Sequence, residues 1–218
     1  MKLKHCLAVC VCLLFFPAQS AAAEPAEKLD RYLNEVFAVV HGYDTEQSSP
    51  ADRERFLKRL SGLAEEIFDF RIMARMCLAK EWQSLSEAQQ DEYVRLFTRF
   101  LEGNYFGKIL QYLDQIQRFS KENITIVDEV IYSAHRAEVH TVITFNEAQV
   151  PIDYRFVARN GPWRIYDICL ENISLVQNYR SQFQGLLQTQ TSEEFLGRLR
   201  QKAESCSLLS KNESADPE

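Results

Sequence analysis

The sequence lacks the short motifs that usually mark a catalytic or nucleotide-binding site. It contains no G-x-x-x-x-G-K-[ST] phosphate loop, no G-x-S-x-G nucleophile elbow and no H-E-x-x-H metalloprotease motif. After residue 23, no two cysteines stand at the spacing of a metal-ligand pair, and the only histidines are His41, His135 and His140. The sequence therefore predicts no catalytic residue, no metal site and no cofactor.

Long apolar runs are also missing beyond the N-terminus. Lys2 and Lys4 precede an apolar run from Cys6 to Phe16, and small residues follow at 21–23. This pattern is typical of a secretory signal peptide. The apolar run is too short to span a bilayer, and no later segment reaches the roughly 18 residues that a spanning helix needs. We predict that residues 1–23 are removed and that a soluble, exported, periplasmic protein remains.

Basic residues are in the minority. The chain has 25 Lys and Arg against 31 Asp and Glu, a net charge of −6, and loss of Lys2 and Lys4 takes it to −8. An acidic chain without a basic stripe argues against a nucleic-acid partner and against docking on anionic lipid surfaces by charge. Any contact with lipid should therefore be apolar.

Cysteine is scarce in the mature chain, where Cys77, Cys169 and Cys206 remain. An odd number permits at most one internal disulfide, so disulfides do not organise the fold. In one interpretation, Cys77 and Cys169 are buried small apolar residues and Cys206 is a thiol in the tail. In the other, the oxidising compartment joins two of the three.

Helical periodicity dominates the first half of the chain. Apolar residues recur at helical spacing over 24–41, and again over 50–68 with a continuation after a bend over 70–82. Ser86, with Gln89 three residues on, predicts the capped start of a long helix. Its expected inner face is Tyr93, Leu96, Phe97, Phe100, Leu101, Tyr105 and Ile109.

After Asn123 the apolar period changes to two, which predicts about four antiparallel strands. Asn160 and Gly161 predict a two-residue hairpin loop with positive φ before a strand over 163–170. Ser174 with Gln177, and Thr191 with Glu194, then predict two closing helices.

Together these elements predict an α+β domain over 24–203, with helices packed on one curved antiparallel sheet, and a polar disordered tail over 204–218.

Aromatic side chains are plentiful, with 14 Phe, 9 Tyr and 2 Trp, of which only Phe15 and Phe16 precede residue 24. Two interpretations are open. The aromatic residues can form an ordinary packed core, or they can line a conical space between the sheet and the helices. Composition alone does not separate the two.

Two segments of the sequence occur in an order typical of a known family. The first contains F-D-F at 68–70, M-A-R at 73–75, Trp82, and Ser86 followed by two glutamines. The second is W-R-I-Y-D at 163–167, followed by I-S-L-V-x-N-Y-R-x-Q-F at 173–183. Together they resemble the MlaC, or toluene-tolerance, family of periplasmic phospholipid-binding proteins. The resemblance spans roughly residues 27–202 and implies an NTF2-like cone with an apolar cavity and no catalytic residues.

The resemblance also implies a function and partners. The protein would carry phospholipid between an outer-membrane lipoprotein–porin complex and an inner-membrane ABC-type lipid transporter, and so maintain outer-membrane lipid asymmetry. The residues expected to line the cavity come from the long helix, the strands and the following helix: Phe97, Phe100, Leu101, Tyr105, Val139, Ile143, Tyr154, Phe156, Ile165, Val176, Tyr179 and Phe183. Arg180 could meet a lipid phosphate, but we expect an ion pair with Asp167 or Glu171.

A second hypothesis is a small exported enzyme that acts on an apolar molecule by acid–base chemistry. It needs a carboxylate or a histidine inside the cone, and the candidates are His140, Asp153 and Asp167. We favour the alternative that His140, Asp153 and Arg155 pair their charges across a solvated sheet face. A third hypothesis is a peptide-binding chaperone with an open apolar groove.

Overall fold

The computed structural model describes residues 24–145, 147–159 and 161–212. The predicted signal peptide lies outside the described residues. The α-helices are α1 Pro25–His41, α2 Pro50–Ile67, α3 Phe70–Leu78, α4 Glu87–Gln111, α5 Leu113–Ile116, α6 Leu175–Leu187 and α7 Ser192–Asn212. The strands are β1 Ile124–Ser133, β2 Arg136–Phe145, β3 Ala148–Val157, β4 Arg164–Leu170 and β5 Ile173–Ser174. Short 3₁₀ turns follow α3, at Ala79–Ser84, and precede β1, at Lys121–Asn123.

The helix starts follow the predicted capping signals. The Ser86 hydroxyl accepts from the Gln89 amide at 3.3 Å, and the Gln89 side chain accepts from the Ser86 amide at 3.0 Å. Thr191 and Glu194 form the same reciprocal pair ahead of α7. These bonds satisfy backbone donors that a helix leaves unpaired in its first turn. Both predicted caps are confirmed.

A break at Phe68 and Asp69 separates α2 from α3 and ties both helices to the sheet. Phe68 has extended backbone geometry, with φ −91° and ψ 141°, and forms a bridge with Ile165 of β4. The Asp69 amide donates to the Ile165 carbonyl at 2.8 Å, and the Asp69 side chain caps α3. The predicted bend therefore lies beside β4.

The five strands form one antiparallel sheet in the order β1-β2-β3-β4-β5. Two bulges interrupt the ladder of the edge strand β1, one between Ile126 and Asp128 and one between Ile131 and Ser133. The class predicted from sequence, α+β with one antiparallel sheet, is confirmed, with five strands where about four were expected.

The register sorts the strand residues onto two faces, because directly opposed residues share a face. One face carries Val139 opposite Tyr154, and Ala137 opposite Phe156. It packs against α1, whose N-terminal Ala26 amide donates to Glu129 of β1 at 2.6 Å. We call this the inner face. The opposite, outer face carries Glu138, His140, Asp153, Arg155 and Asp167.

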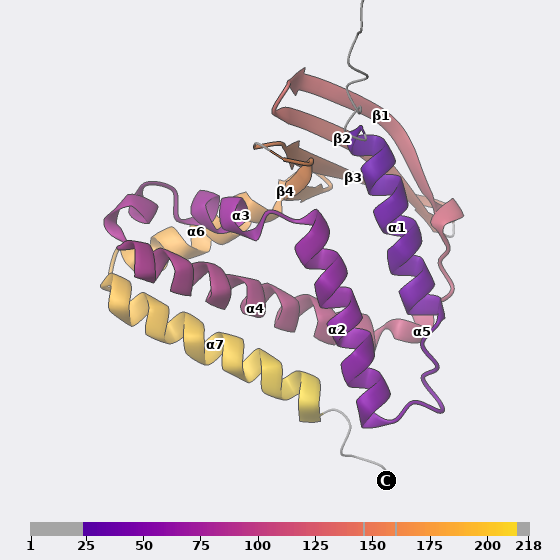
Figure 1. Cartoon of the computed structure of the whole chain (residues 1–218), viewed down its shortest axis with the longest axis horizontal. Coiled ribbons are helices and arrows are strands. Elements are labelled where there is room, and N and C mark those ends of the chain that lie inside the picture. The colour runs from indigo at the N-terminus through magenta and orange to yellow at the C-terminus, as the bar shows by residue number, and fades with distance from the viewer. Residues whose placement is uncertain (1–23, 146, 160, 213–218) are drawn as a thin grey trace, which may run out of the picture.

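Buried apolar residues gather in two large clusters. The helical core joins α3, α4, α6 and α7, and in Figure 1 α4 and α7 lie side by side along their length. The sheet core joins α1 and the break after α2 to the inner face of the sheet. A smaller cluster links α1 and α2 to α5. No helix in the described part of the chain is long and apolar enough to cross a bilayer.

Two local predictions are wrong. The connection between β3 and β4 covers residues 158–163 rather than two residues, and Gly161 does not have a positive φ. Pro162 gives the reason, because it has no N–H for the ladder and restricts the residue before it to extended backbone. The C-terminal segment also departs from expectation, since α7 continues through 204–212 where a disordered tail was predicted.

Candidate apolar ligand site

The structure divides the predicted cavity residues between the two cores. The helical core contains Phe97, Phe100, Leu101, Val176, Tyr179 and Phe183. The sheet core contains Val139, Tyr154, Phe156 and Ile165, with Ile143 at its margin. Tyr105 is 41% exposed, so its expected place on the buried face of the long helix is wrong. The residues predicted to form one wall therefore belong to two different cores.

In the helical core, aromatic rings pack directly against one another. The rings of Phe100 and Tyr179 are 5.5 Å apart, those of Tyr179 and Phe183 5.8 Å, and those of Phe183 and Phe195 5.3 Å. All four side chains are buried. Separations of this size are those of packed aromatic pairs, which stabilise a fold by more than their area alone.

Around the sheet core, apolar side chains are only half-buried. They come from all four long strands and from α1: Tyr32, Phe37, Ile126, Ile143, Ile152 and Ile168. These side chains leave apolar surface on the inner face of the sheet, as half-buried side chains also do around the helical core.

Part of this surface is a row that crosses the whole sheet on its inner face. Ile126 lies opposite Thr141, which lies opposite Ile152, and the row continues through Leu170 to Ile173. Leu170 is 48% exposed and Ile173 is 67% exposed. Thr141, the polar residue between Ile126 and Ile152, donates its hydroxyl to the Ile152 carbonyl at 2.9 Å and so leaves no unpaired polar group there. We call Ile126, Ile152, Leu170 and Ile173 the apolar row.

The dimensions of the elements explain why the row is not covered. Five strands at about 4.8 Å spacing extend about 19 Å across, whereas one helix is about 10 Å wide. Helix α1 lies over β1 and β2, and α2 reaches β4 only at its end, near Arg164 and Ile165. On β3 and β4 the inner face is therefore buried at Tyr154, Phe156 and Ile165, but Ile152 stays half-buried and Leu170 exposed.

Tyrosine hydroxyls within the sheet core stay neutral. Burial raises the pKa of Tyr154 to about 12 and also raises the pKa of Tyr32 above its usual value. Both groups remain protonated at neutral pH, so neither places a charge beside the apolar row.

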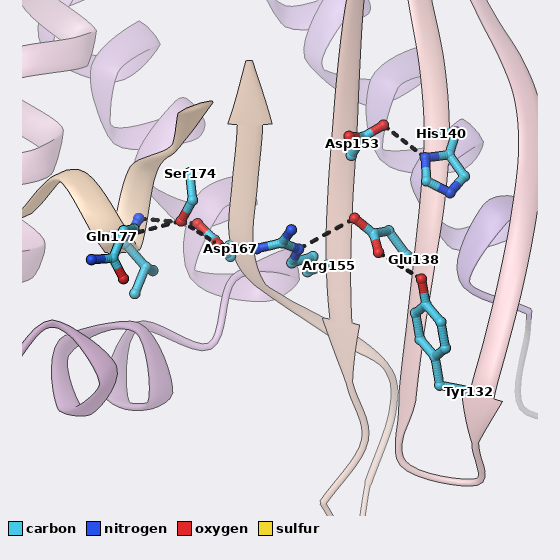
Figure 2. Close-up of polar contacts among 9 residues, drawn as sticks. Tyr132, Glu138, His140, Asp153, Arg155, Asp167, Ser174 and Gln177 are labelled. Carbon is cyan, nitrogen blue, oxygen red and sulfur yellow. Dashed lines mark hydrogen bonds and ion pairs between the residues drawn. The ribbon is translucent and has the colours of Figure 1, made fainter. Parts of the chain in front are cut away.

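The outer face carries a polar network that runs from β1 to α6 (Figure 2). The Tyr132 hydroxyl donates to Glu138 at 2.9 Å, and Arg155 Nε donates to the same carboxylate at 3.2 Å. The other end of the Arg155 guanidinium meets Asp167 at 3.1 Å. The network therefore links β1, β2, β3 and β4 through one arginine.

Asp167 is the buried end of this network, with a side chain that is 3% exposed. It accepts from the Ser174 hydroxyl at 2.6 Å and from the Val176 amide at 3.0 Å. Ser174 in turn accepts from the Gln177 amide at 3.0 Å. The carboxylate thus holds the first turn of α6 on β4, where it also complements the positive end of the helix dipole.

These positions bear on the residues considered for catalysis. His140 Nδ1 lies 2.7 Å from Asp153, which confirms the prediction of cross-strand pairing. Both residues and Asp167 lie on the outer face, opposite the apolar row. The enzyme hypothesis required them inside the cone, so the structure gives it no support.

Arg180 does not form the predicted ion pair. Its Nε donates to the Met76 carbonyl at 2.8 Å and so fastens α6 to α3. Asp167 pairs instead with Arg155, which lies directly opposite it on the neighbouring strand. Register, which sequence separation does not reveal, decides the partner.

Cys77 and Cys169 follow the first of the two interpretations. Cys77 and Cys169 are buried and unpaired, and burial raises the pKa of the Cys77 thiol to about 12. Both therefore act as small apolar residues. The Cys206 side chain lies outside the described residues.

An open antiparallel sheet with an incompletely covered apolar inner face and a polar outer face defines an α+β protein suited to binding an apolar ligand. The chain belongs to the MlaC family, whose model, described as MlaC protein, matches residues 30–201.

Among solved structures, the chain is similar to the phospholipid-binding protein from Ralstonia solanacearum, whose structure is a complex with a phospholipid. The two share 18% identity with a TM-score of 0.63, over 82% of this chain and 96% of the other. That likeness supports the fold. No curated protein matches the chain.

Proposed function

We propose that this protein binds a phospholipid and holds its acyl chains against the inner face of the sheet. The observation that carries the proposal is the apolar row with its half-buried neighbours Tyr32 and Phe37 on α1. Membership of the MlaC family and the fold shared with a lipid-complexed protein support it.

The two cores take different parts in this proposal. The acyl chains contact Ile143 and Tyr154 together with the apolar row. Val139, Phe156 and Ile165 are fully buried beneath them and hold the wall in place. The helical-core residues expected in the cavity form its packed support, and Tyr105 lies at an exposed margin.

The energetics of transfer favour an apolar site with the headgroup near solvent. At about 0.8 kcal/mol per CH₂, two chains of roughly sixteen carbons cost on the order of 25 kcal/mol to expose to water. A hydrogen bond to a headgroup contributes about 0.5 to 1.5 kcal/mol net, or about 1.5 to 3 kcal/mol when charged. Apolar contacts must therefore supply most of the affinity.

A carrier of this kind would act between membranes. We infer a periplasmic protein that exchanges phospholipid between an outer-membrane lipoprotein–porin complex and an inner-membrane ABC-type transporter, and so maintains lipid asymmetry. The leader-like residues 1–23 and the family support this location.

The test is organic extraction of the purified mature protein, followed by mass analysis of the extract. We expect about one diacyl phospholipid per folded chain. A clean extract from folded, monodisperse protein, together with no uptake from phospholipid vesicles, would contradict the proposal.

A further inference from the structure

Three side chains that could bind a metal ion lie close together on the outer face of the sheet, opposite the apolar row. Glu138 and His140 lie two residues apart on β2, so both project from the same face. Asp153 lies directly opposite His140 on β3. One ligating atom from each residue lies within 4.8 Å of the other two. Figure 2 shows His140 and Asp153 turned toward each other, with the Glu138 carboxylate beside them and directed at Arg155 and Tyr132.

The donor set is one imidazole and two carboxylates. Imidazole nitrogen and carboxylate oxygen are the ligands that zinc and neighbouring divalent transition metals accept, and three protein ligands with one open position are a common arrangement. The side chains are 12%, 34% and 22% exposed for Glu138, His140 and Asp153. They are thus sheltered, while an ion can still reach them from solvent.

The charge balance of the surrounding network favours a cation. Glu138, Asp153 and Asp167 bring three negative charges, and Arg155, which contacts Glu138 and Asp167, brings one positive charge. With His140 neutral, the network carries a charge of −2, which one divalent ion neutralises. Arg155 can yield its contact with Glu138 to the ion because it keeps its contact with the more deeply buried Asp167.

From this convergence we propose that Glu138, His140 and Asp153 bind a divalent transition-metal ion of the zinc class. The ion would lie between His140 Nδ1 and the Asp153 carboxylate in place of their direct contact and join β2 to β3. The fourth position faces solvent, so the ion is bound reversibly rather than enclosed. The site is independent of the phospholipid site, because its ligands lie on the opposite face of the sheet.

Calorimetric titration of tag-free, chelator-treated protein with zinc chloride tests the proposal, with cobalt chloride and visible absorption as a second readout of coordination. We expect one ion per chain. His140→Ala should abolish binding, and Asp153→Asn or Glu138→Gln should weaken it by about 10- to 100-fold. His135→Ala is the matched control, because His135 lies on the same hairpin and its ring contacts the Ala158 carbonyl rather than the proposed ligands. It should leave the affinity unchanged.

Far-ultraviolet circular dichroism and the thermal midpoint of each variant separate ligand loss from unfolding. If His140→Ala does not fold, His140→Gln, which keeps a polar group on the strand, replaces it. Absence of binding at millimolar zinc overturns the proposal. The proposal is also overturned if replacing His140 leaves the zinc affinity unchanged, or if His135→Ala lowers the zinc affinity as much as replacing His140 does. Phospholipid extraction is scored separately, so failure of either proposal leaves the other standing.

Discussion

The helical core and the sheet core contain the same kinds of side chain, and half-buried apolar side chains border both, but the inner face of the sheet also ends in the exposed Leu170 and Ile173. Phe97, Tyr179 and Phe183 lie among four helices and contact one another from several directions. On the sheet, α1 covers β1 and β2 and leaves Ile152 half-buried and Leu170 exposed. Apolar composition alone therefore does not distinguish the two regions, whereas the exposure left by the covering helices does.

The largest expected effect distinguishes a fully buried aromatic ring from a half-buried one. Phe97→Ala should lower the free energy of unfolding by about 3–5 kcal/mol, because it leaves a cavity in the helical core. Phe37→Ala, the same change at a half-buried ring of α1, should cost about 1–1.5 kcal/mol. Urea unfolding of lipid-free protein measures both. Equal losses would mean that the two regions are packed alike.

The next largest effect tests the Asp167 contacts that join β4 to α6. Asp167→Asn should cost about 3 kcal/mol, because it breaks a buried ion pair and weakens the bonds to Ser174 and Val176. Asp91→Asn, which breaks the exposed pair with Arg71, is the control and should cost less than about 1 kcal/mol. Thermal unfolding compares the two. An Asp167→Asn protein as stable as the control would show that the network adds no net stability.

A third change sharpens the comparison between the two faces of the sheet. Ile143→Asp places a charge on the apolar inner face and should reduce phospholipid affinity at least about tenfold, or about 1.4 kcal/mol. Val142→Asp is matched, because the neighbouring residue is equally half-buried but faces outward. Uptake of fluorescent phospholipid from vesicles measures both. Similar losses would mean that the tails do not lie on the inner face.

The smallest expected effect concerns one hydroxyl. Ser174→Ala removes the cap of α6 and one bond to Asp167, and should cost about 1 kcal/mol. Thr191→Ala removes the cap of α7 and should cost a similar amount. Because Ser174 also touches the network, its substitution together with Asp167→Asn should cost less than the sum of the two separately.

Features that depend on near neighbours were predictable from the sequence. Ser86 and Thr191 cap their helices through residues three positions on, so the capping pattern was sufficient. The change of the apolar period to two after Asn123 likewise correctly predicted the strands of the sheet. The turn at Gly161 failed because Pro162, its immediate neighbour, excludes the tight hairpin that Asn-Gly usually forms.

Features that depend on register or on covering layers were not predictable. Arg155 rather than Arg180 pairs with Asp167, and only the alignment of β3 with β4 decides this. The family resemblance led us to expect Val139 and Phe183 on one wall, but they belong to different cores. Strand alternation could have found Ile126 and Ile152 on the face of Tyr154, although not that no helix covers Leu170.

The bulges in β1 bear on how copies of the protein avoid one another. A regular, exposed edge strand of ten residues would offer a ladder of unpaired backbone groups to a second sheet. The extra residues Val127 and Tyr132 break that ladder twice, and Asp128 adds a charge beside the first break. The β1 edge therefore offers a second sheet an interrupted ladder, which disfavours edge-to-edge pairing of two copies of the chain.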